Sequence, residues 1–279
     1  MALATVPPKP ASTPVFWRDE RLAFIEARYV EDGRHVCYAR HAHDFFSIGA
    51  ITAGESVYIN GAANERVSAG TVVLINPEDV HACNPIDDRP WSYIMLYVDV
   101  HWLAQVQQAF GTHQSRAFRP FPTHMTTEPE IFAGLNRLYT VLIDEQTNPA
   151  DKESAARAFF CEVQSMLGDT EATPTEQSNP KLTKAAQYIR SNFTRPVKLE
   201  EICEAAELSS SYLIRAFKGR YGMTPHAYLV NCRIEYSRSQ LKRGRAIADV
   251  AVEAGFADQA HLQRAFRQFT AVTPRQYRG

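Results

Sequence analysis

A residue pattern that occurs twice near the carboxyl end of this 279-residue chain limits its possible folds more than any other feature. The segment from Ile202 to Ser209 matches the segment from Val250 to Ala257 at an offset of 48 residues. Each copy predicts a short helix, a tight turn and a second helix, followed by a Thr-Pro pair that starts another helix. After one inserted residue, the matches continue as Leu213 with Leu262, Phe217 with Phe266, Thr224-Pro225 with Thr273-Pro274, and Tyr228 with Tyr277.

Local residue choices indicate where these helices begin. Ser209 is a good N-cap for a helix over 210–219, and Gly255 falls in the turn before a helix over 258–268. Thr224-Pro225 places a capping hydroxyl before a proline at the first helical position. The helix that follows, over 226–243, would be about 27 Å long. It can hold the two units about one turn of duplex DNA apart, roughly 34 Å.

The second helix of each unit is expected to be amphipathic, because its leucine and phenylalanine lie four residues apart and share one face. The opposite face carries amides and cations, whose donors and acceptors fit base edges in the major groove. We expect DNA contacts from Ser210, Ser211, Ile214, Arg215 and Lys218 in the first unit, and from Gln259, His261, Gln263, Arg264 and Arg267 in the second. Other cations of this region, namely Arg220, Arg233, Arg238, Lys242 and Arg243, are expected to contact phosphates or to lie on the surface.

Charge is distributed unevenly along the chain. Residues 180–279 contain 17 lysines and arginines against 8 acidic residues, a net charge of +9, whereas residues 1–179 contain 13 against 23, a net charge of −10. A compact basic segment is typical of a polyanion partner, most simply nucleic acid, although a helical bundle that binds protein is the alternative. Residues 168–180 join the two parts and contain prolines and small polar residues but no large apolar residue, as interdomain linkers do.

Residues 21–167 show two successive patterns. Up to Val98, short apolar segments alternate with turn sequences such as Asn60-Gly61 and Asn76-Pro77, which is typical of a β-sandwich or barrel. Apolar residues then recur at helical spacing on both sides of Asn148-Pro149, so two antiparallel helices are expected to pack on the barrel. Strands are expected at Leu22–Tyr29, Val36–Arg40, Phe45–Ile51, Ser56–Ile59, Thr71–Ile75 and Tyr93–Val98.

The first of these two helices carries an apolar stripe that has two interpretations. Ile131, Leu135, Leu138 and Leu142 follow one another at steps of four, three and four residues. The stripe can pack in the core of one chain or form a dimerisation seam between two chains. Two heptads are too short to decide between these interpretations, so both stay open at this point.

Residues from about Val197 to Arg278 resemble the DNA-binding domain of the AraC/XylS family of bacterial transcription regulators. The most specific part is IADVAVEAGFADQAHLQRAFRQFTAVTPRQYR, residues 247–278, which resembles the family signature along its whole length. The resemblance implies that the helices over 210–219 and 258–268 enter successive major grooves of DNA. The positions that match the family's base-reading residues are Ser211, Ile214 and Arg215 in the first unit and Gln259, His261, Gln263 and Arg264 in the second.

Three residues depart from the family pattern. Ala271 stands where a glycine is usual, so the turn there is expected to be strained or differently built. Ser237 replaces a common alanine in the linking helix. Ile214 cannot hydrogen-bond a base, so the first unit is expected to read thymine methyl groups or the DNA backbone.

Residues 35–100 resemble the cupin-like barrel that serves as sensor domain in many AraC-type regulators. The resemblance rests on His41-Ala-His43, on His81 and on glycine-containing turns. A metal-binding cupin would carry a glutamate four or five residues after the H-x-H, where this chain has Ser47 and Ile48. We therefore expect no metal ion and no cofactor, and histidines that cap loops or hydrogen-bond a ligand, although three imidazoles alone are a possible zinc or iron site.

Strand alternation puts Trp91, Tyr93, Met95 and Tyr97 on one face, and an aromatic-lined pocket suits a small organic effector. A packed barrel without a pocket is the alternative. The expected effector contacts are His41, His43, His81, Trp91, Tyr93 and Tyr97.

The remaining features favour a cytoplasmic protein. No apolar segment approaches the roughly 20 residues of a membrane helix. Residues 1–20 are expected to form a flexible tail, and they lack the apolar region of a secretory signal. The five cysteines are odd in number, far apart and without a C-x-x-C pair, which argues for a reducing compartment.

Together these features predict a two-domain α+β chain. Its parts are a tail over 1–20, a cupin-like effector-binding and dimerisation domain over 21–167, a linker over 168–180 and an all-α double helix-turn-helix domain over 181–279. Within the domain over 21–167, a β-barrel is followed by two helices. The predicted function is a sequence-specific DNA-binding transcription regulator, an activator rather than an enzyme. Expected partners are double-stranded DNA, a small-molecule effector, RNA polymerase and a second copy of the chain, with no membrane contact.

Two alternatives stay open. The first is a cupin metalloenzyme fused to a DNA-binding module, which would require bound metal. The second is a regulator whose N-terminal domain binds only protein.

Overall fold

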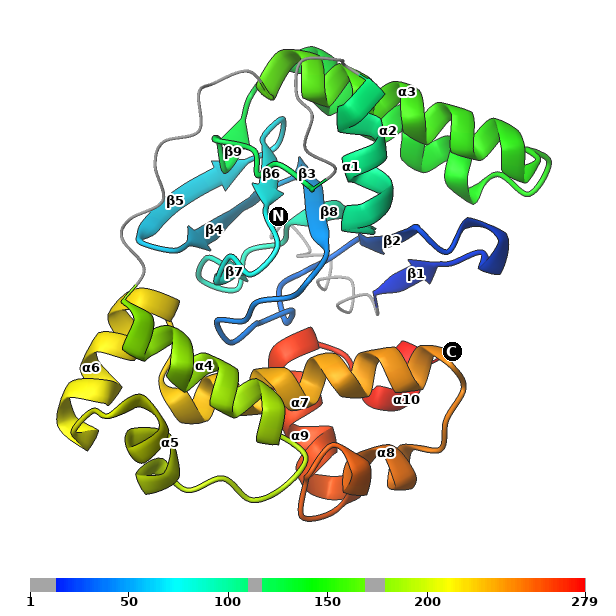
Figure 1. The fold of residues 1–279 in the computed structure, drawn as a ribbon. Coiled ribbons are helices and arrows are strands. Elements are labelled where there is room, and N and C mark those ends of the chain that lie inside the picture. Colours follow the sequence, from blue (N-terminus) through cyan, green and yellow to red (C-terminus); the bar gives the residue numbers. More distant parts are fainter. Residues whose placement is uncertain (1–13, 110–116, 169–178, 279) are drawn as a thin grey trace, which may run out of the picture.

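The computed structural model describes residues 14–109, 117–168 and 179–278, which form a β-rich half and a helical half (Figure 1). The expected fold class, a β-rich domain followed by an all-helical domain, is confirmed. Most of the predicted linker over 168–180 lies outside the described residues. The strands are β1 (Val15–Trp17), β2 (Ile25–Val30), β3 (Phe46–Ala53), β4 (Glu55–Asn60), β5 (Ala63–Ser68), β6 (Val72–Ile75), β7 (His81–Pro85), β8 (Ser92–Val98) and β9 (Met125–Thr126).

The strands form two antiparallel sheets. The larger sheet has the order β1-β2-β8-β3-β6-β9, and the smaller one has the order β5-β4-β7. At the centre of the larger sheet, β8 pairs with β2 from Ile25 opposite Val98 to Val30 opposite Tyr93, and with β3 on its other side. The expected barrel is therefore two sheets that do not close into one continuous ring.

Two predictions about the first 40 residues are wrong. Val36–Arg40 forms no strand, because the backbone N–H groups of Tyr38 and Ala39 donate to the Asn84 side chain and to the Gln268 carbonyl oxygen instead of to a neighbouring strand. Residues 14–20 do not belong to a flexible tail, since Val15–Trp17 pairs with β2 and a short 3-10 helix follows at Glu20–Leu22. The rest of the predicted tail, residues 1–13, lies outside the described residues.

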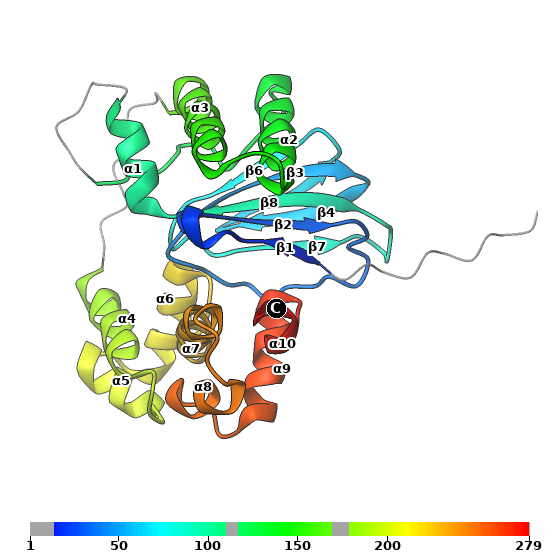
Figure 2. The same ribbon diagram turned by 90° about the vertical axis from the view of Figure 1, so that its right-hand side faces the viewer.

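Three helices lie on the outer face of the larger sheet (Figure 2): α1 (Val100–Ala109), α2 (Pro129–Ile143) and α3 (Pro149–Leu167). Both α2 and α3 begin with proline at the first position, as helices commonly do. The apolar stripe of α2, Ile131, Leu135, Leu138 and Leu142, is at most 3% exposed and packs with the sheet and α3. Of the two interpretations of this stripe, core packing is therefore confirmed and the dimer seam is wrong, because exposing one such side chain would cost roughly 1.5–3 kcal/mol.

The helical half contains α4 (Pro180–Asn192), α5 (Leu199–Ala206), α6 (Ser210–Tyr221), α7 (Pro225–Lys242), α8 (Ile247–Glu253), α9 (Gln259–Thr270) and α10 (Pro274–Arg278). Two apolar cores lie along it. One joins α4, α5 and α6 to the first half of α7, and the other joins α8, α9 and α10 to the second half of α7. The two predicted helix-turn-helix units are thus carried by one long helix (Figure 1). Within the described ranges, no helix is long and apolar enough to cross a membrane.

The turns of the second unit explain two sequence features. Gly255 has a φ of 80°, and a Cβ atom there would lie 2.7 Å from the Thr194 carbonyl oxygen, so only glycine fits. Ala271 ends α9 in the left-handed conformation with a φ of 58°. The strain expected at Ala271 from the sequence is therefore present.

Replacing Ala271 with glycine is expected to stabilise the helical half. The left-handed conformation costs an alanine roughly 1–2 kcal/mol, and the greater unfolded-state entropy of glycine offsets only about 0.4–1 kcal/mol of the gain. Chemical denaturation should show a free energy of unfolding up to about 1 kcal/mol higher for Ala271→Gly. The control, Ala260→Gly on the exposed face of α9, should lower it. A less stable Ala271→Gly protein would contradict the strain argument.

Candidate functional site

The second helix of each repeat presents a polar face to solvent. Leu213 and Phe217 of α6, and Leu262 and Phe266 of α9, are fully buried, as their spacing predicts. Helix α9 begins at an Asp258 N-cap whose side chain accepts from the His261 backbone N–H. The predicted DNA contacts that are exposed are Ser210, Ser211, Ile214, Arg215 and Lys218 of α6 and Gln259, Gln263, Arg264 and Arg267 of α9; His261 is half-buried against Phe256.

The cations on these two faces are unpaired. Within the described part of the chain, no ion pair or hydrogen bond engages the side chains of Arg215, Lys218, Arg264 or Arg267. Some cations elsewhere in the same half are paired, as Arg245 is with Glu253. A row of exposed cations without internal partners is what a polyanion can neutralise.

Two other cations of the helical half do not lie where the sequence suggests, whereas Lys242 lies on the surface as expected. Arg233 and Arg238 are 7% and 8% exposed, so neither is a surface residue or a phosphate contact. Arg233 donates to the carbonyl oxygens of Phe193 and Arg195, and Arg238 pairs with Glu235. Lys242 forms an ion pair with Glu26 of β2 at 2.6 Å. The side chains of Arg238 and Lys242 therefore face the β-rich half instead of DNA.

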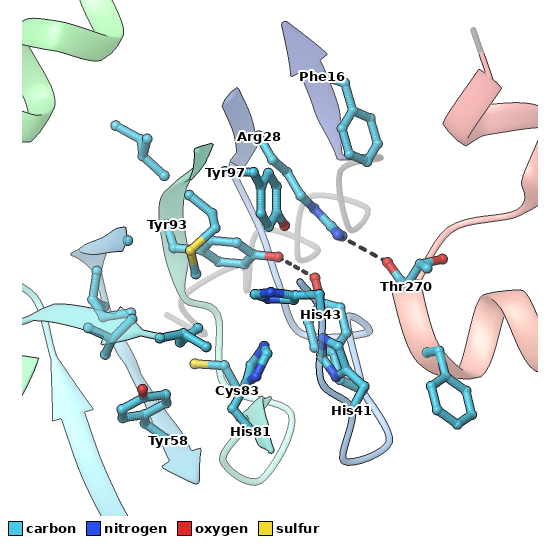
Figure 3. A pocket seen from close by; sticks show the side chains of 18 of the residues that line it. Phe16, Arg28, His41, His43, Tyr58, His81, Cys83, Tyr93, Tyr97 and Thr270 are labelled. Carbon is cyan, nitrogen blue, oxygen red and sulfur yellow. Dashed lines mark hydrogen bonds between the residues drawn. The ribbon is translucent and has the colours of Figure 1, made fainter. Parts of the chain in front are cut away.

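A cavity of about 50 Å³ lies between the two sheets and is closed by the helical half (Figure 3). Its walls come from β1, β2, β3, β4, β6, β7 and β8, from the segment before β3, and from α7, α9 and α10. All six predicted effector residues line it, namely His41, His43, His81, Trp91, Tyr93 and Tyr97. The aromatic face of β8 is thus the face that points into the cavity, and Ile94, Leu96 and Val98 belong to the core under α2 and α3.

The aromatic wall is fixed in place by its own contacts. Trp91 stacks on Tyr93 with ring centroids 4.6 Å apart, and its indole N–H donates to the Gly33 carbonyl oxygen at 3.0 Å. The hydroxyl groups of Tyr38 and Tyr93 lie 2.7 Å apart. A rigid, mainly aromatic wall with a few polar groups is the usual lining of a small-molecule site.

Arg28 of β2 supplies a buried positive charge in this cavity, and its guanidinium lies over the rings of Phe16 and Tyr38 at 5.3 and 5.4 Å. Its side chain is 3% exposed, and Nη1 donates to the Thr270 carbonyl oxygen at the end of α9 at 3.0 Å. Among the described residues, Nε and Nη2 of Arg28 have no hydrogen-bond acceptor. Unpaired N–H groups of a buried cation are costly, and an anion in the cavity would satisfy them.

Three histidines gather at one end of the cavity. His43 and His81 are buried and His41 is half-buried. Burial lowers the pKa of His81 to about 4, and burial together with the nearby His81 holds the pKa values of His41 and His43 well below the usual value. All three imidazoles are therefore neutral near pH 7.

The two halves are joined by hydrogen bonds and ion pairs from several elements. The Asn231 side chain of α7 accepts from the Ala42 backbone N–H at 3.1 Å and donates to the Ala42 carbonyl oxygen at 2.8 Å. Arg18 donates to the Tyr277 carbonyl oxygen, and Arg190 pairs with Glu78. The position of the helical half is thus specified by directional contacts around the cavity.

Two family models match this chain. Residues 24–160 match the AraC-like ligand binding domain, and residues 202–279 match a helix-turn-helix domain. The chain belongs to the AraC family of transcription regulators. It is accordingly a regulator with an N-terminal ligand-binding domain and a C-terminal DNA-binding domain, as the sequence predicts.

Relatives with this organisation match most of the chain. The uncharacterized HTH-type transcriptional regulator YbfI of Bacillus subtilis is 27% identical over 228 residues, which is 81% of each chain. The HTH-type transcriptional activator RhaR of Klebsiella pneumoniae is 24% identical, over 86% of this chain and 87% of the relative. An apo form of ToxT from Vibrio cholerae superposes with a TM-score of 0.56 and 16% identity, over 97% of this chain and 98% of that chain, which shows a shared two-domain fold.

The sequence did not indicate the cavity residues that come from β2 and from the helical half. Arg28, Arg238, Thr270 and Tyr277 line the cavity, yet three of them belong to the helical half. The only signal was the position of Arg28 in the strand segment Ile25–Val30, whose one other charged residue is Glu26.

Removing the Asn231 side chain is expected to loosen the contact between the halves. Asn231→Ala would leave the buried N–H and carbonyl groups of Ala42 without partners, which costs about 1–3 kcal/mol. Chemical denaturation should show this loss in the free energy of unfolding. Asn64→Ala, an exposed position on the edge strand β5, is the control and should change it by less than about 0.5 kcal/mol. Equal effects of the two substitutions would show that the contact contributes nothing.

Proposed function

We propose that this regulator is an effector-controlled transcription activator that reads DNA with α6 and α9 and senses an anionic small molecule in the cavity beside Arg28. The observation that carries the proposal is the cavity itself, whose walls come from both halves. A ligand held there touches the sensor sheets and the DNA-binding helices at once, so it can favour one arrangement of the two.

The proposed DNA contacts are the exposed side chains of the two helices. Arg264 and Gln263 of α9 are exposed and have the donor groups that read base edges, and Arg215 occupies the equivalent face of α6. Lys218 and Arg267 lie toward the carboxyl ends of the two helices and are proposed as phosphate contacts. Ile214 is 40% exposed, which supports a contact with thymine methyl groups.

Arg264→Ala is expected to weaken binding to a specific duplex by about 1–3 kcal/mol and to relax base preference at one position. The duplex is first selected from a random library with the full-length chain, and affinities are then measured for the selected and a scrambled sequence. Lys218→Ala should weaken binding to both duplexes alike, and it should reduce the slope of log affinity against log salt concentration by about one. Arg137→Ala, exposed on α2, is the control and should change neither.

Two outcomes would contradict this assignment. Equal losses of Arg264→Ala on selected and scrambled DNA would show that Arg264 contacts only phosphate. Affinity that stays flat between 50 and 200 mM salt would contradict the neutralisation of phosphates by these cations.

The proposed effector combines an apolar or aromatic body with an anionic group. The aromatic wall of Trp91, Tyr93 and Tyr97 suits the body, and the two unsatisfied donors of Arg28 suit a carboxylate. Solved ToxT structures hold an unsaturated fatty acid and (E)-4-(8-methylnaphthalen-1-yl)but-3-enoic acid, both carboxylic acids, which supports this class. Because Nη1 of Arg28 already contacts Thr270, a carboxylate on Nε and Nη2 would strengthen the contact between the halves.

A thermal-shift screen of carboxylic acids, each paired with its neutral amide, tests the effector proposal. An acid present at 100 times its dissociation constant should stabilise the chain by about 2.7 kcal/mol, and its amide should do so much less. Arg28→Met should fold, because it replaces a buried cation by an apolar side chain of similar size, and should lose the preference for acids. Arg137→Met is the surface control. Equal shifts from acids and amides would refute an anionic effector.

The remaining assignments are also proposals. The relatives RhaR and RhaS are transcriptional activators. This supports the proposals that the present chain activates transcription and contacts RNA polymerase. It also supports a sensor role, rather than catalysis, for the N-terminal domain. We infer a cytoplasmic homodimer. Ile143 of α2 and Met166 of α3 are exposed apolar residues, and both helices lie on the side of the larger sheet away from the helical half (Figure 2). We propose that they supply the dimer surface in place of the buried stripe.

A further inference from the structure

We propose that His41, His43 and His81 form a binding site for one divalent transition-metal ion, with zinc as the best fit. Their ligand nitrogens all lie within 4.8 Å of one another. The residue pattern alone predicts no metal, because Ser47 and Ile48 occupy the positions of the usual carboxylate. The arrangement of the three rings reverses that expectation and goes beyond the proposed regulatory function.

The first argument is the orientation of the rings. In each histidine Nδ1 lies 2.9 Å from a backbone carbonyl oxygen two residues away, Ala39 for His41, Phe45 for His43 and Asp79 for His81. A carbonyl oxygen can only accept, so each Nδ1 carries the proton and each Nε2 keeps a free lone pair. Metal-binding histidines are held in this way, with the second ring nitrogen donating to a backbone carbonyl or carboxylate.

The second argument is that the Nε2 atoms lack other partners. Among the described residues, no hydrogen bond reaches Nε2 of His41 or His81, and Nε2 of His43 has only a long contact of 3.3 Å with the Ser47 hydroxyl. Three lone pairs that converge without a donor repel one another, and a cation placed between them removes this repulsion. Figure 3 shows the three rings gathered at the end of the cavity opposite Arg28.

The third argument is rigidity. The backbones of His41 and His81 exchange two hydrogen bonds, at 3.1 and 2.9 Å, so the two rings are held side by side with centroids 4.3 Å apart. The ring of His43 stacks on Phe45 at 3.9 Å and meets His81 edge-on at 4.7 Å. Zinc bonds of about 2.0–2.1 Å need nitrogens roughly 3.3 Å apart, which small side-chain rotations supply.

The chemistry of the ligand set selects the ion. Neutral imidazoles suit zinc, copper, iron and nickel, whereas calcium and magnesium prefer oxygen ligands. Three histidines leave a fourth position open toward the cavity. Arg28 and Arg238 line the same cavity, and their positive charges favour an anion at that fourth position.

The test is zinc binding by the full-length chain without any effector. We expect one Zn²⁺ per chain after dialysis, with a micromolar or tighter dissociation constant by competition with a chromogenic chelator. Substituted Co²⁺ should give the intense visible absorption of a tetrahedral site, without the thiolate charge-transfer band that binding at cysteine would produce. Variants His43→Gln and His81→Gln should each lose more than about 100-fold in affinity, beyond the 10–100-fold effect of a positioning residue.

His101→Gln, at an exposed position on α1, is the control and should bind zinc like the unchanged chain. Circular dichroism and thermal unfolding without metal establish that each variant folds. If one variant does not fold, the cobalt spectrum of the unchanged chain still tests whether the site is tetrahedral. The proposal is overturned if the unchanged chain binds no zinc in the micromolar range, or if the double variant His43→Gln/His81→Gln binds it equally well. Either result leaves the effector proposal intact, because the carboxylic-acid screen is performed without metal.

Discussion

The docking of the helical half onto the sensor sheets is the interaction on which the rest of this structure depends. Neither half completes the cavity alone, because the sheets supply the aromatic wall while α7, α9 and α10 close the opposite side. The contacts that hold the halves together are directional, with Asn231 bonded twice to Ala42 and Arg28 bonded to Thr270. Such contacts fix one orientation more strictly than apolar packing does, since hydrogen bonds require both distance and alignment.

Burial separates the arginines of the helical half into two groups. Arg215, Arg264 and Arg267 are exposed and have no internal partner among the described residues, while Arg233 and Arg238 are buried and hydrogen-bonded. The net positive charge of this half therefore overstates its DNA-binding surface. Arg238 faces the rings of Phe45 and Tyr97 at 4.8 and 5.8 Å, so part of that charge faces the sensor domain.

Local signals explain what could be predicted from the sequence. Helices α6, α7 and α9 begin within one residue of their expected starts. Thr224 caps α7 through its side chain as expected, whereas Ser209 stands at the N-cap of α6 without a side-chain hydrogen bond. Strand β5 was missed, since its sequence ANERVS has one buried residue and no alternating pattern. The functions of Arg28 and Asn231 could not be predicted, because their partners lie 242 and 189 residues away in the chain. The six residues predicted to contact an effector line the cavity, because strand alternation indicated the aromatic residues and the resemblance to a cupin indicated the histidines.

The two helix-turn-helix units are connected to the cavity unequally. Among the described residues, the cavity wall includes Phe269 and Thr270 of α9 but no residue of α4, α5 or α6. A ligand in the cavity would contact the second unit directly, at Thr270 of α9 and Tyr277 of α10. The first unit meets the sensor domain beside the cavity, where Asn231 of α7 bonds to Ala42 and Arg190 of α4 pairs with Glu78. The second unit thus forms part of the cavity wall itself, whereas the first is held on the sensor domain next to that wall.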